Sequence, residues 1–211
     1  ILVDWSNLDD CSHAFLISAT LVCDGRPITL YSETHQLCTR EKPATHKYFL
    51  EHLKTLLPEN CHPIIVADAG FKVPWHEQVV SQGWDYVGRV RKSNYCKFDT
   101  EDSFVDLDEV FKKATGTAKC YEGLLTKSNQ FETTFVLYNN PPKGRHKLTA
   151  EGEKCSSTHS KKHAKGATEP WVLVTSLPLC STLAKRVVKV YKSRMQIEEG
   201  YRDIKSSCFG L

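Results

Sequence analysis

Short apolar runs separated by polar turns fill the first ninety residues, and their lengths predict an alternation of strands and helices. Three strands, a helix, a strand, a helix and a further strand are typical of a mixed α/β sheet with helices packed against it. We expect the strands at residues 1–6, 14–23 and 27–34, the helix at 44–57, the next strand at 63–67, a helix after Pro74 and the last strand at 84–90.

From about residue 91 to 177 the pattern changes to short β-like runs, such as residues 130–138, with turn and charge clusters between them. We interpret this region as a β-rich insertion that ends with a strand at 171–175. A low-complexity basic stretch from about 141 to 168 interrupts the insertion, and its composition predicts a flexible loop.

A helix is predicted from about residue 181 onward, because Leu183, Val190, Ile197 and Ile204 recur at heptad spacing and form an apolar seam. This helix would return the chain to the core of the sheet. The seam lies roughly 100° round the helix from Glu198, so we expect the polar face to stay free of packing.

The polar face of this helix groups Tyr191, Arg194, Glu198 and Lys205 within a sector of roughly 60°. On most surface helices, a carboxylate and two cations on one face are only solvated ion pairs. Whether this face carries chemistry therefore depends on which other groups lie beside it.

Two aspartates stand at the ends of apolar runs: Asp4 after Ile1-Leu2-Val3, and Asp68 after the run at 63–67. An acid at the end of a core strand is unfavourable without a partner. Either aspartate alone could be a cap or turn residue. Together with Glu198 they place three carboxylates at one edge of the sheet, and divalent cations supply the charge and oxygen coordination that such a group needs.

These segments together resemble the catalytic segments of bacterial DDE transposases of the insertion-sequence-four family, and within it the tetracycline-resistance-transposon type. The matching segments are the strand-end Asp4, Asp68-Ala69-Gly70-Phe71, and Tyr-x2-Arg-x3-Glu-x6-Lys over residues 191–205. Further matching stretches are Lys72-Val73-Pro74-Trp75, residues 83–84 and 88–91, Glu169-Pro170-Trp171-Val172-Leu173, and residues 194–199. The resemblance runs from one end of the chain to the other.

The resemblance implies a ribonuclease-H-like fold, whose strand and helix order agrees with the pattern above. Residues 1–90 would form the first part of the catalytic core, 91–177 the insertion and 178–211 the catalytic helix that completes the core. The chain begins inside a strand without methionine, so we expect a fragment that lacks the family's amino-terminal DNA-binding region and carboxy-terminal pairing region.

The resemblance also implies the chemistry, which is cut-and-paste DNA transposition by a metal-dependent endonuclease and strand transferase. Asp4 would bridge two metal ions, and Asp68 and Glu198 would each complete the coordination of one. Mg²⁺ is the expected ion, with Mn²⁺ able to substitute. Nicking of the transposon end, hairpin formation, hairpin opening and strand transfer would all use this site.

The DNA contacts are likewise implied by the resemblance, with terminal inverted repeats and target DNA as partners of a homodimer. Tyr191, Arg194, Arg202 and Lys205 would hold the DNA end. Trp171 would stack on a base flipped out during hairpin formation, although a tryptophan that opens a strand is also a common core residue. The other two implied DNA contacts, Arg89 and Arg91, could equally be solvent-exposed charges.

Charge is divided unevenly along the 211 residues, whose net charge is +3. Residues 1–90 hold 7 Lys and Arg against 11 Asp and Glu, whereas residues 91–211 hold 21 against 14. A basic half beside an acidic site suits a nuclease on a DNA track, but basic halves also occur in proteins that bind no nucleic acid.

No apolar run approaches the ~20 residues of a membrane span, which predicts no membrane partner. With the resemblance, this indicates a bacterial, cytoplasmic and nucleoid-associated protein. Nine cysteines, an odd number without Cys-x2-Cys spacing, argue against a disulfide framework. Cys155, His159 and His163 lack a fourth ligand for zinc, and the sequence leaves open whether they bind metal.

Two other functions remain compatible with the sequence. One is a non-enzymatic DNA-binding protein derived from a transposase, which the complete set of acidic residues disfavours. The other is a different ribonuclease-H-like nuclease, such as a junction resolvase or an RNA-cleaving enzyme. The large insertion with Trp171 and the Tyr-Arg-Glu-Lys helix disfavour that nuclease.

Overall fold

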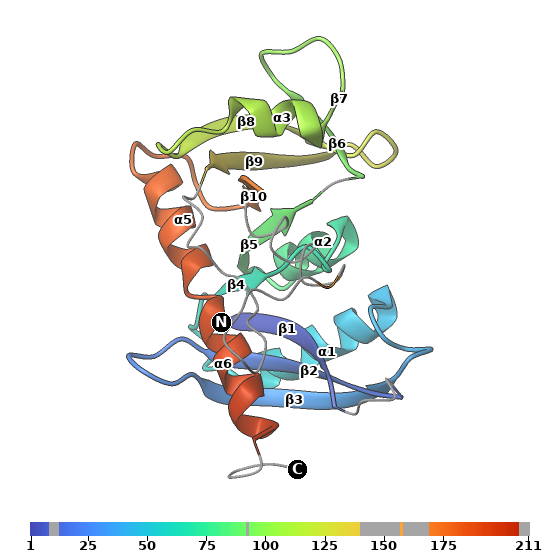
Figure 1. Ribbon diagram of the computed structural model, residues 1–211. Helices are drawn as coiled ribbons and strands as arrows, with labels where there is room; N and C mark the ends of the chain where they lie inside the picture. The colour runs from blue at the N-terminus through green and yellow to red at the C-terminus, as the bar shows by residue number, and fades with distance from the viewer. Residues whose placement is uncertain (9–12, 92, 140–156, 158–168, 207–211) are drawn as a thin grey trace.

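A computed structural model of the chain describes residues 1–8, 13–91, 93–139, 157 and 169–206, which form one ten-stranded sheet with helices on both faces (Figure 1). The strands are β1 (Leu2–Asn7), β2 (Ala14–Leu21), β3 (Ile28–Gln36), β4 (Ile64–Ala67), β5 (Asp85–Val90), β6 (Tyr95–Phe98), β7 (Val105–Asp106), β8 (Lys119–Leu125), β9 (Phe131–Tyr138) and β10 (Trp171–Thr175). The helices are α1 (Pro43–Leu56), α2 (Val73–Ser81), α3 (Leu107–Lys113), α5 (Leu183–Lys192) and α6 (Met195–Ile204).

The first five strands lie in the order β3-β2-β1-β4-β5. The chain runs antiparallel from β1 to β2 and from β2 to β3, and α1 then carries it to β4, which pairs parallel with β1. Helix α2 leads to β5, which pairs parallel with β4. This arrangement confirms the ribonuclease-H-like mixed sheet, with Asp4 and Asp68 carried by neighbouring strands.

The β-rich region after β5 continues the same sheet instead of starting a new one. Its final strand, β10, pairs antiparallel with β5, and β9, β8, β6 and β7 follow outward in that order. Gly123 of β8 permits a close approach to β6, because a Cβ there would lie 2.2 Å from the backbone oxygen of Lys97. Apart from Ser157, the basic stretch expected at about 141–168 lies outside the described residues.

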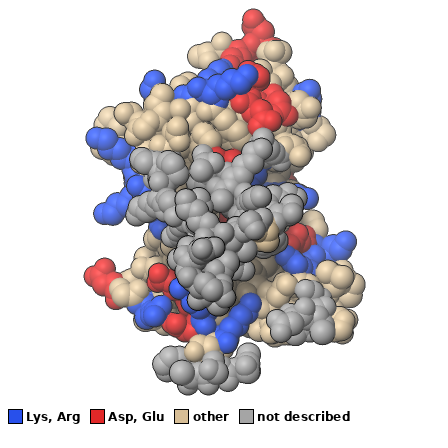
Figure 2. Space-filling view, viewed as in Figure 1, with Lys and Arg blue, Asp and Glu red and all other residues tan. Residues whose placement is uncertain are grey.

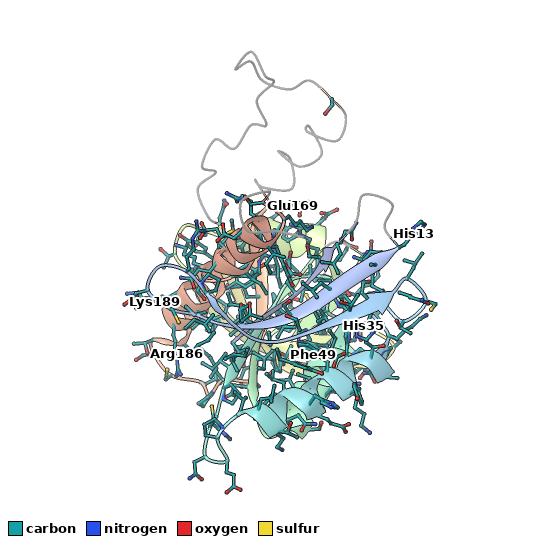
Figure 3. All side chains as sticks on the ribbon, turned by 90° about the horizontal axis from the view of Figure 1, so that it is seen from below. His13, His35, Phe49, Glu169, Arg186 and Lys189 are labelled. Carbon is teal, nitrogen blue, oxygen red and sulfur yellow. The ribbon has the colours of Figure 1, made fainter. Side chains whose placement is uncertain are left out.

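Helices cover the two faces of the sheet with separate apolar cores (Figure 1). On one face, α1 and α2 bury Phe49, Leu50 and Trp75 against the strands, and Phe49 lies between α1 and the sheet in Figure 3. On the other face, α5 and α6 bury Leu183 and Ile197. In the described part of the chain, no helix is long and apolar enough to cross a membrane.

The single helix expected after residue 181 is wrong, because the chain forms two helices with a break at Ser193 and Arg194. Across the break, Arg194 N–H donates to Tyr191 O at 3.1 Å and Ile197 N–H donates to Arg194 O at 3.2 Å. These bonds span three residues instead of four, so the local winding is tighter than in an α-helix.

The break changes which side chains of this segment are buried. Tyr191 and Tyr201 are buried with Ile197, whereas Val190 and Ile204 of the expected seam are only half-buried. The expectation that the Tyr191 face stays free of packing is therefore wrong. The burial of this face also leaves Arg194, at the break, 12% exposed.

Candidate active site

Asp4 and Asp68 lie side by side because of the register between β1 and β4. Val3 stands opposite Ala67 in this parallel pair, so the next position on each strand is an aspartate. Side chains alternate along a strand, and Leu2 of β1 packs against α5 and α6, so Asp4 points toward the same helices. The backbone N–H of Trp5 donates to Asp4 Oδ1 at 2.8 Å and helps to hold that carboxylate.

Arg194 joins these two aspartates to Glu198. Its Nη1 lies 3.2 Å from Asp4 Oδ2 and 3.8 Å from Asp68 Oδ2, while its Nη2 lies 2.5 Å from Glu198 Oε1. Glu198 stands one turn after Arg194, at the start of α6. The structure thus brings together all three predicted carboxylates, around one guanidinium that the same pattern had singled out.

Tyr191 contacts both Asp68 and Trp171. Its hydroxyl donates to Asp68 Oδ1 at 3.0 Å, and its ring meets Trp171 edge-to-face with 5.0 Å between ring centroids. Tyr138 contacts Trp171 from β9, with ring centroids 5.9 Å apart. Trp171 therefore stands beside the carboxylates as a half-buried wall, held between two tyrosines.

The electrostatics of the two aspartates differ although they are neighbours. Burial raises the pKa of Asp4 to about 6, with Arg194 opposing that rise and Asp68 adding to it. Burial also disfavours the ionised form of Asp68, but Arg194, the Ala69 N–H and two further arginines outweigh it and lower the pKa of Asp68. The cations around Asp68 therefore favour its ionised form, whereas burial disfavours the ionised form of Asp4.

The donor set fits a divalent metal, because carboxylate oxygens are the ligands that Mg²⁺ and Mn²⁺ prefer. In the conformation described, however, Arg194 stands among the carboxylates. Within the described residues, no group of three or more His, Cys, Asp or Glu side chains is arranged to hold an ion. Cys155, His159 and His163 lie outside the described residues.

The remaining predicted DNA contacts fall into two groups. Arg91, Arg202 and Lys205 are exposed, and none of them reaches the carboxylates through a hydrogen bond or ion pair of the described structure. Arg89, in contrast, is buried on β5 with 7% of its surface exposed. The structure therefore separates the two arginines that the sequence pattern had treated alike.

Sequence reasoning did not single out Tyr201, although it contributes directly to the site. Its hydroxyl donates to the backbone oxygen of Asp4 at 2.5 Å and ties α6 to β1. Helical spacing indicates that Tyr201 faces the site, because a residue three positions after Glu198 lies on nearly the same face of the helix. An aromatic residue in a helix is also typical of a core position, which hides this signal.

A row of exposed cations on α5 was also not singled out. Lys and Arg side chains gather along the edge of the molecule that α5 forms (Figure 2), and Arg186 and Lys189 point outward there (Figure 3). The exposed basic residues of this helix are Lys185, Arg186, Lys189 and Lys192. Because α5 leads directly to Arg194, this edge places positive charge beside the carboxylates.

Comparison with known proteins gives a family match and similar solved structures. The family model described as the transposase DDE domain matches residues 15–211. No curated protein matches the sequence. Among solved structures, the chain is similar to a piggyBac transposase seen by cryo-EM in a synaptic complex with hairpin DNA, at a TM-score of 0.47 and 14% identity. The match covers 94% of this chain and 38% of that transposase.

Proposed function

Because the chain belongs to the transposase DDE domain family, we propose that it is the catalytic core of a DNA transposase. The observation that carries the proposal is the meeting of Asp4, Asp68 and Glu198 around Arg194 at one edge of the sheet. In this proposal the three carboxylates hold two Mg²⁺ ions, with Mn²⁺ able to replace them. Asp4 would contribute a ligand to both ions, as the resemblance implies.

The ions would supply charge stabilisation for the attacking and leaving oxygens of a phosphodiester bond. The chain's own groups then have distinct tasks. Arg194 neutralises the carboxylates while no metal is bound, and its planar guanidinium suits a DNA phosphate once metal ions occupy those oxygens. Tyr191 orients Asp68, and Tyr201 fixes the backbone of Asp4.

The DNA end would lie along the edge formed by α5 and the start of α6. The exposed cations of α5, together with Arg91, Arg202 and Lys205, would neutralise phosphates along this path. Trp171 has a half-buried ring beside Tyr191, which suits stacking on an unpaired base at the mouth of the site.

The finer assignment extends this proposal and rests on the signature residues of the sequence. We assign the chain to the bacterial insertion-sequence-four type, with cut-and-paste transposition through hairpin ends and strand transfer. A homodimer would pair two terminal inverted repeats, and the protein would act at the bacterial nucleoid. Residues 1–90 and 178–211 would form the catalytic core, with 91–177 as its insertion.

Cleavage of a labelled duplex that carries the cognate element end tests the proposal. The protein that contains this chain is incubated with Mg²⁺, and nicked and hairpin products are separated on a denaturing gel. We expect Glu198→Gln to lower the rate by about 10³-fold or more, as expected when a catalytic group is removed.

The matched control is Glu199→Gln, on the next residue of the same helix. Glu199 lies 3.9 Å from the exposed Arg26 and takes no part in the carboxylate group, so its variant is expected to cut normally. Cleavage that survives Glu198→Gln would contradict the site assignment. Specific binding of the end without any cleavage by the wild type would instead favour a DNA-binding protein derived from a transposase.

A further inference from the structure

Arg89 is a charged side chain that the fold buries next to the carboxylate group. It belongs to β5, and the pairing of Ala67 with Gly88 places it beside Asp68 at the next position of the parallel pair. Strand alternation puts it on the same face as Val87, which packs against α5 and α6. Asp4, Asp68 and Arg89 therefore form a row across three neighbouring strands.

Tyr191 interacts with both Arg89 and Asp68. Its hydroxyl group opposes the burial-driven fall in the pKa of Arg89. The same hydroxyl donates to Asp68 Oδ1 at 3.0 Å. Since Tyr191 is also buried, water has little access to this group of side chains.

The buried guanidinium of Arg89 contributes little to the stability of this face of the sheet. In the described structure its Nε and Nη2 are buried and have no hydrogen-bond partner. A buried donor that lacks a partner destabilises the folded state, because it loses its hydrogen bonds to water without replacement. An apolar side chain of similar length would avoid this penalty, so the arginine calls for an explanation other than packing.

We infer that Arg89 is a positioning residue for Asp68, acting through Tyr191, and not a contact to DNA. The inference rests on the proposed function in one respect, namely that Asp68 binds a divalent ion. Tyr191 has one hydroxyl proton, and the positive charge of Arg89 beside it favours directing that proton away from Arg89 and toward Asp68. Asp68 Oδ1 is thereby fixed, and Oδ2 is turned toward Arg194 and the place between the carboxylates.

The test is Mn²⁺ binding to the metal-stripped protein, measured by calorimetry and by the electron paramagnetic resonance signal of free Mn²⁺. We expect Arg89→Met to weaken Mn²⁺ binding about 10- to 100-fold, the usual effect of losing a partner of a metal ligand. The midpoint of thermal unfolding should stay equal or rise, because the unpaired buried donors disappear. Arg89→Lys should recover part of the affinity, since its ammonium keeps a positive charge beside Tyr191.

A double-mutant cycle keeps the test independent of one variant's folding. Tyr191→Phe removes the hydroxyl that connects the two residues, so adding Arg89→Met to it should weaken Mn²⁺ binding no further. A loss in the double variant equal to the sum of the two single losses would overturn the inference.

The matched control is Arg91→Met, two residues further along the chain and exposed. Without metal, Arg91→Met should weaken binding of a labelled duplex and flatten its salt dependence, whereas Arg89→Met should leave both unchanged. If Arg89→Met weakens metal-free DNA binding as much as Arg91→Met does, Arg89 is a phosphate contact and the inference is wrong.

Two further outcomes separate this inference from the proposed function. If Arg89→Met binds Mn²⁺ as tightly as the wild type or more tightly, the only effect of Arg89 on the site is that its positive charge repels the metal ion. The inference then fails, while the proposed metal site stands. If the wild type binds no Mn²⁺, the proposed function fails and the inference fails with it.

Discussion

On the α1 and α2 face of the sheet the buried histidines, His46 and His76, are neutral, and we call it the neutral face after them, whereas on the α5 and α6 face ions group around Arg194. Burial lowers the pKa of His46 to about 4 and that of His76 to about 3. His46 accepts a hydrogen bond from Trp5 Nε1 at 3.2 Å and stacks on Phe71. The fold thus keeps these two histidines uncharged on one face and groups three carboxylates and an arginine on the face where we place the chemistry.

This difference shows how one sheet can serve two purposes. The neutral face gains stability from apolar and aromatic packing, which is independent of metal. The charged face holds three carboxylates that repel one another, and its stability depends on a counter-ion. Perturbing each face in turn should therefore give different dependence on metal and on pH.

Removing the counter-ion should produce the largest change in stability. Arg194→Gln leaves the three carboxylates without their shared cation and is expected to lower the free energy of unfolding by about 3 kcal/mol without metal, since the carboxylates are only partly exposed. Adding Mg²⁺ should stabilise this variant more than the wild type. Urea unfolding with and without Mg²⁺ measures both effects.

The control for this variant is Arg26→Gln, which removes an exposed arginine 3.3 Å from Asp203 on α6. We expect its free energy of unfolding to change by less than about 0.5 kcal/mol. If Arg194→Gln is no less stable than Arg26→Gln, the charged face does not depend on its counter-ion.

A packing change on the neutral face should have a smaller effect that does not depend on metal. A Cβ at Gly88 would lie 2.4 Å from Cε1 of the buried His76, so Gly88→Ala is expected to destabilise the protein by about 1–3 kcal/mol. Gly116→Ala is the control, because nothing lies within 4 Å of a Cβ there. An equal Mg²⁺ response in Gly88→Ala and wild type, seen by urea unfolding, would support the separation of the two faces.

Acid should act on the neutral face through His46. Its pKa is lowered from an ordinary value near 6.5 to about 4, so the unfolded chain binds more protons between these values and stability falls as the pH drops through this window. The loss should reach about 1.4 kcal/mol per pH unit for this group. At pH 7 the histidine is neutral in both the folded and the unfolded state, so this loss of stability is absent.

His46→Gln sharpens this prediction, because glutamine can still accept from Trp5 but does not take up a proton. Thermal unfolding from pH 7 to pH 4 should show a shallower pH dependence in this variant than in the wild type. The exposed His62 provides the control, and His62→Gln should keep the wild-type slope. An unchanged slope in His46→Gln would mean that other groups govern the acid response.

The placement of Asp4 and Asp68 could be predicted from sequence because it follows from two local facts. Each aspartate ends a short apolar run, and runs of that kind form the buried central strands of a mixed sheet. The meeting with Glu198 required the helix to return to the same edge, which the spacing of its apolar residues indicated. The sheet and the convergence of the carboxylates were therefore predictable.

The break at Ser193 and Arg194 was not predictable from that spacing. A shift from four-residue to three-residue hydrogen bonds alters the phase of the helix by a fraction of a turn, and the apolar pattern on either side tolerates it. The burial of Arg89 left a weak signal, since it stands between Gly88 and Val90 in a run that is otherwise a core strand. Helix α3 is only seven residues long, too short for its periodicity to stand out.

The pairing of β5 with β10 has a consequence for protein engineering. Val90, the last residue of β5, stands opposite Val172, so the roughly eighty intervening residues begin and end at adjacent positions of the sheet. The entropic cost of holding the two ends of a segment together rises only slowly with the length of the segment. A shorter or foreign module could therefore be grafted between these two valines, provided that it covers the edge of β10 that β9 covers now.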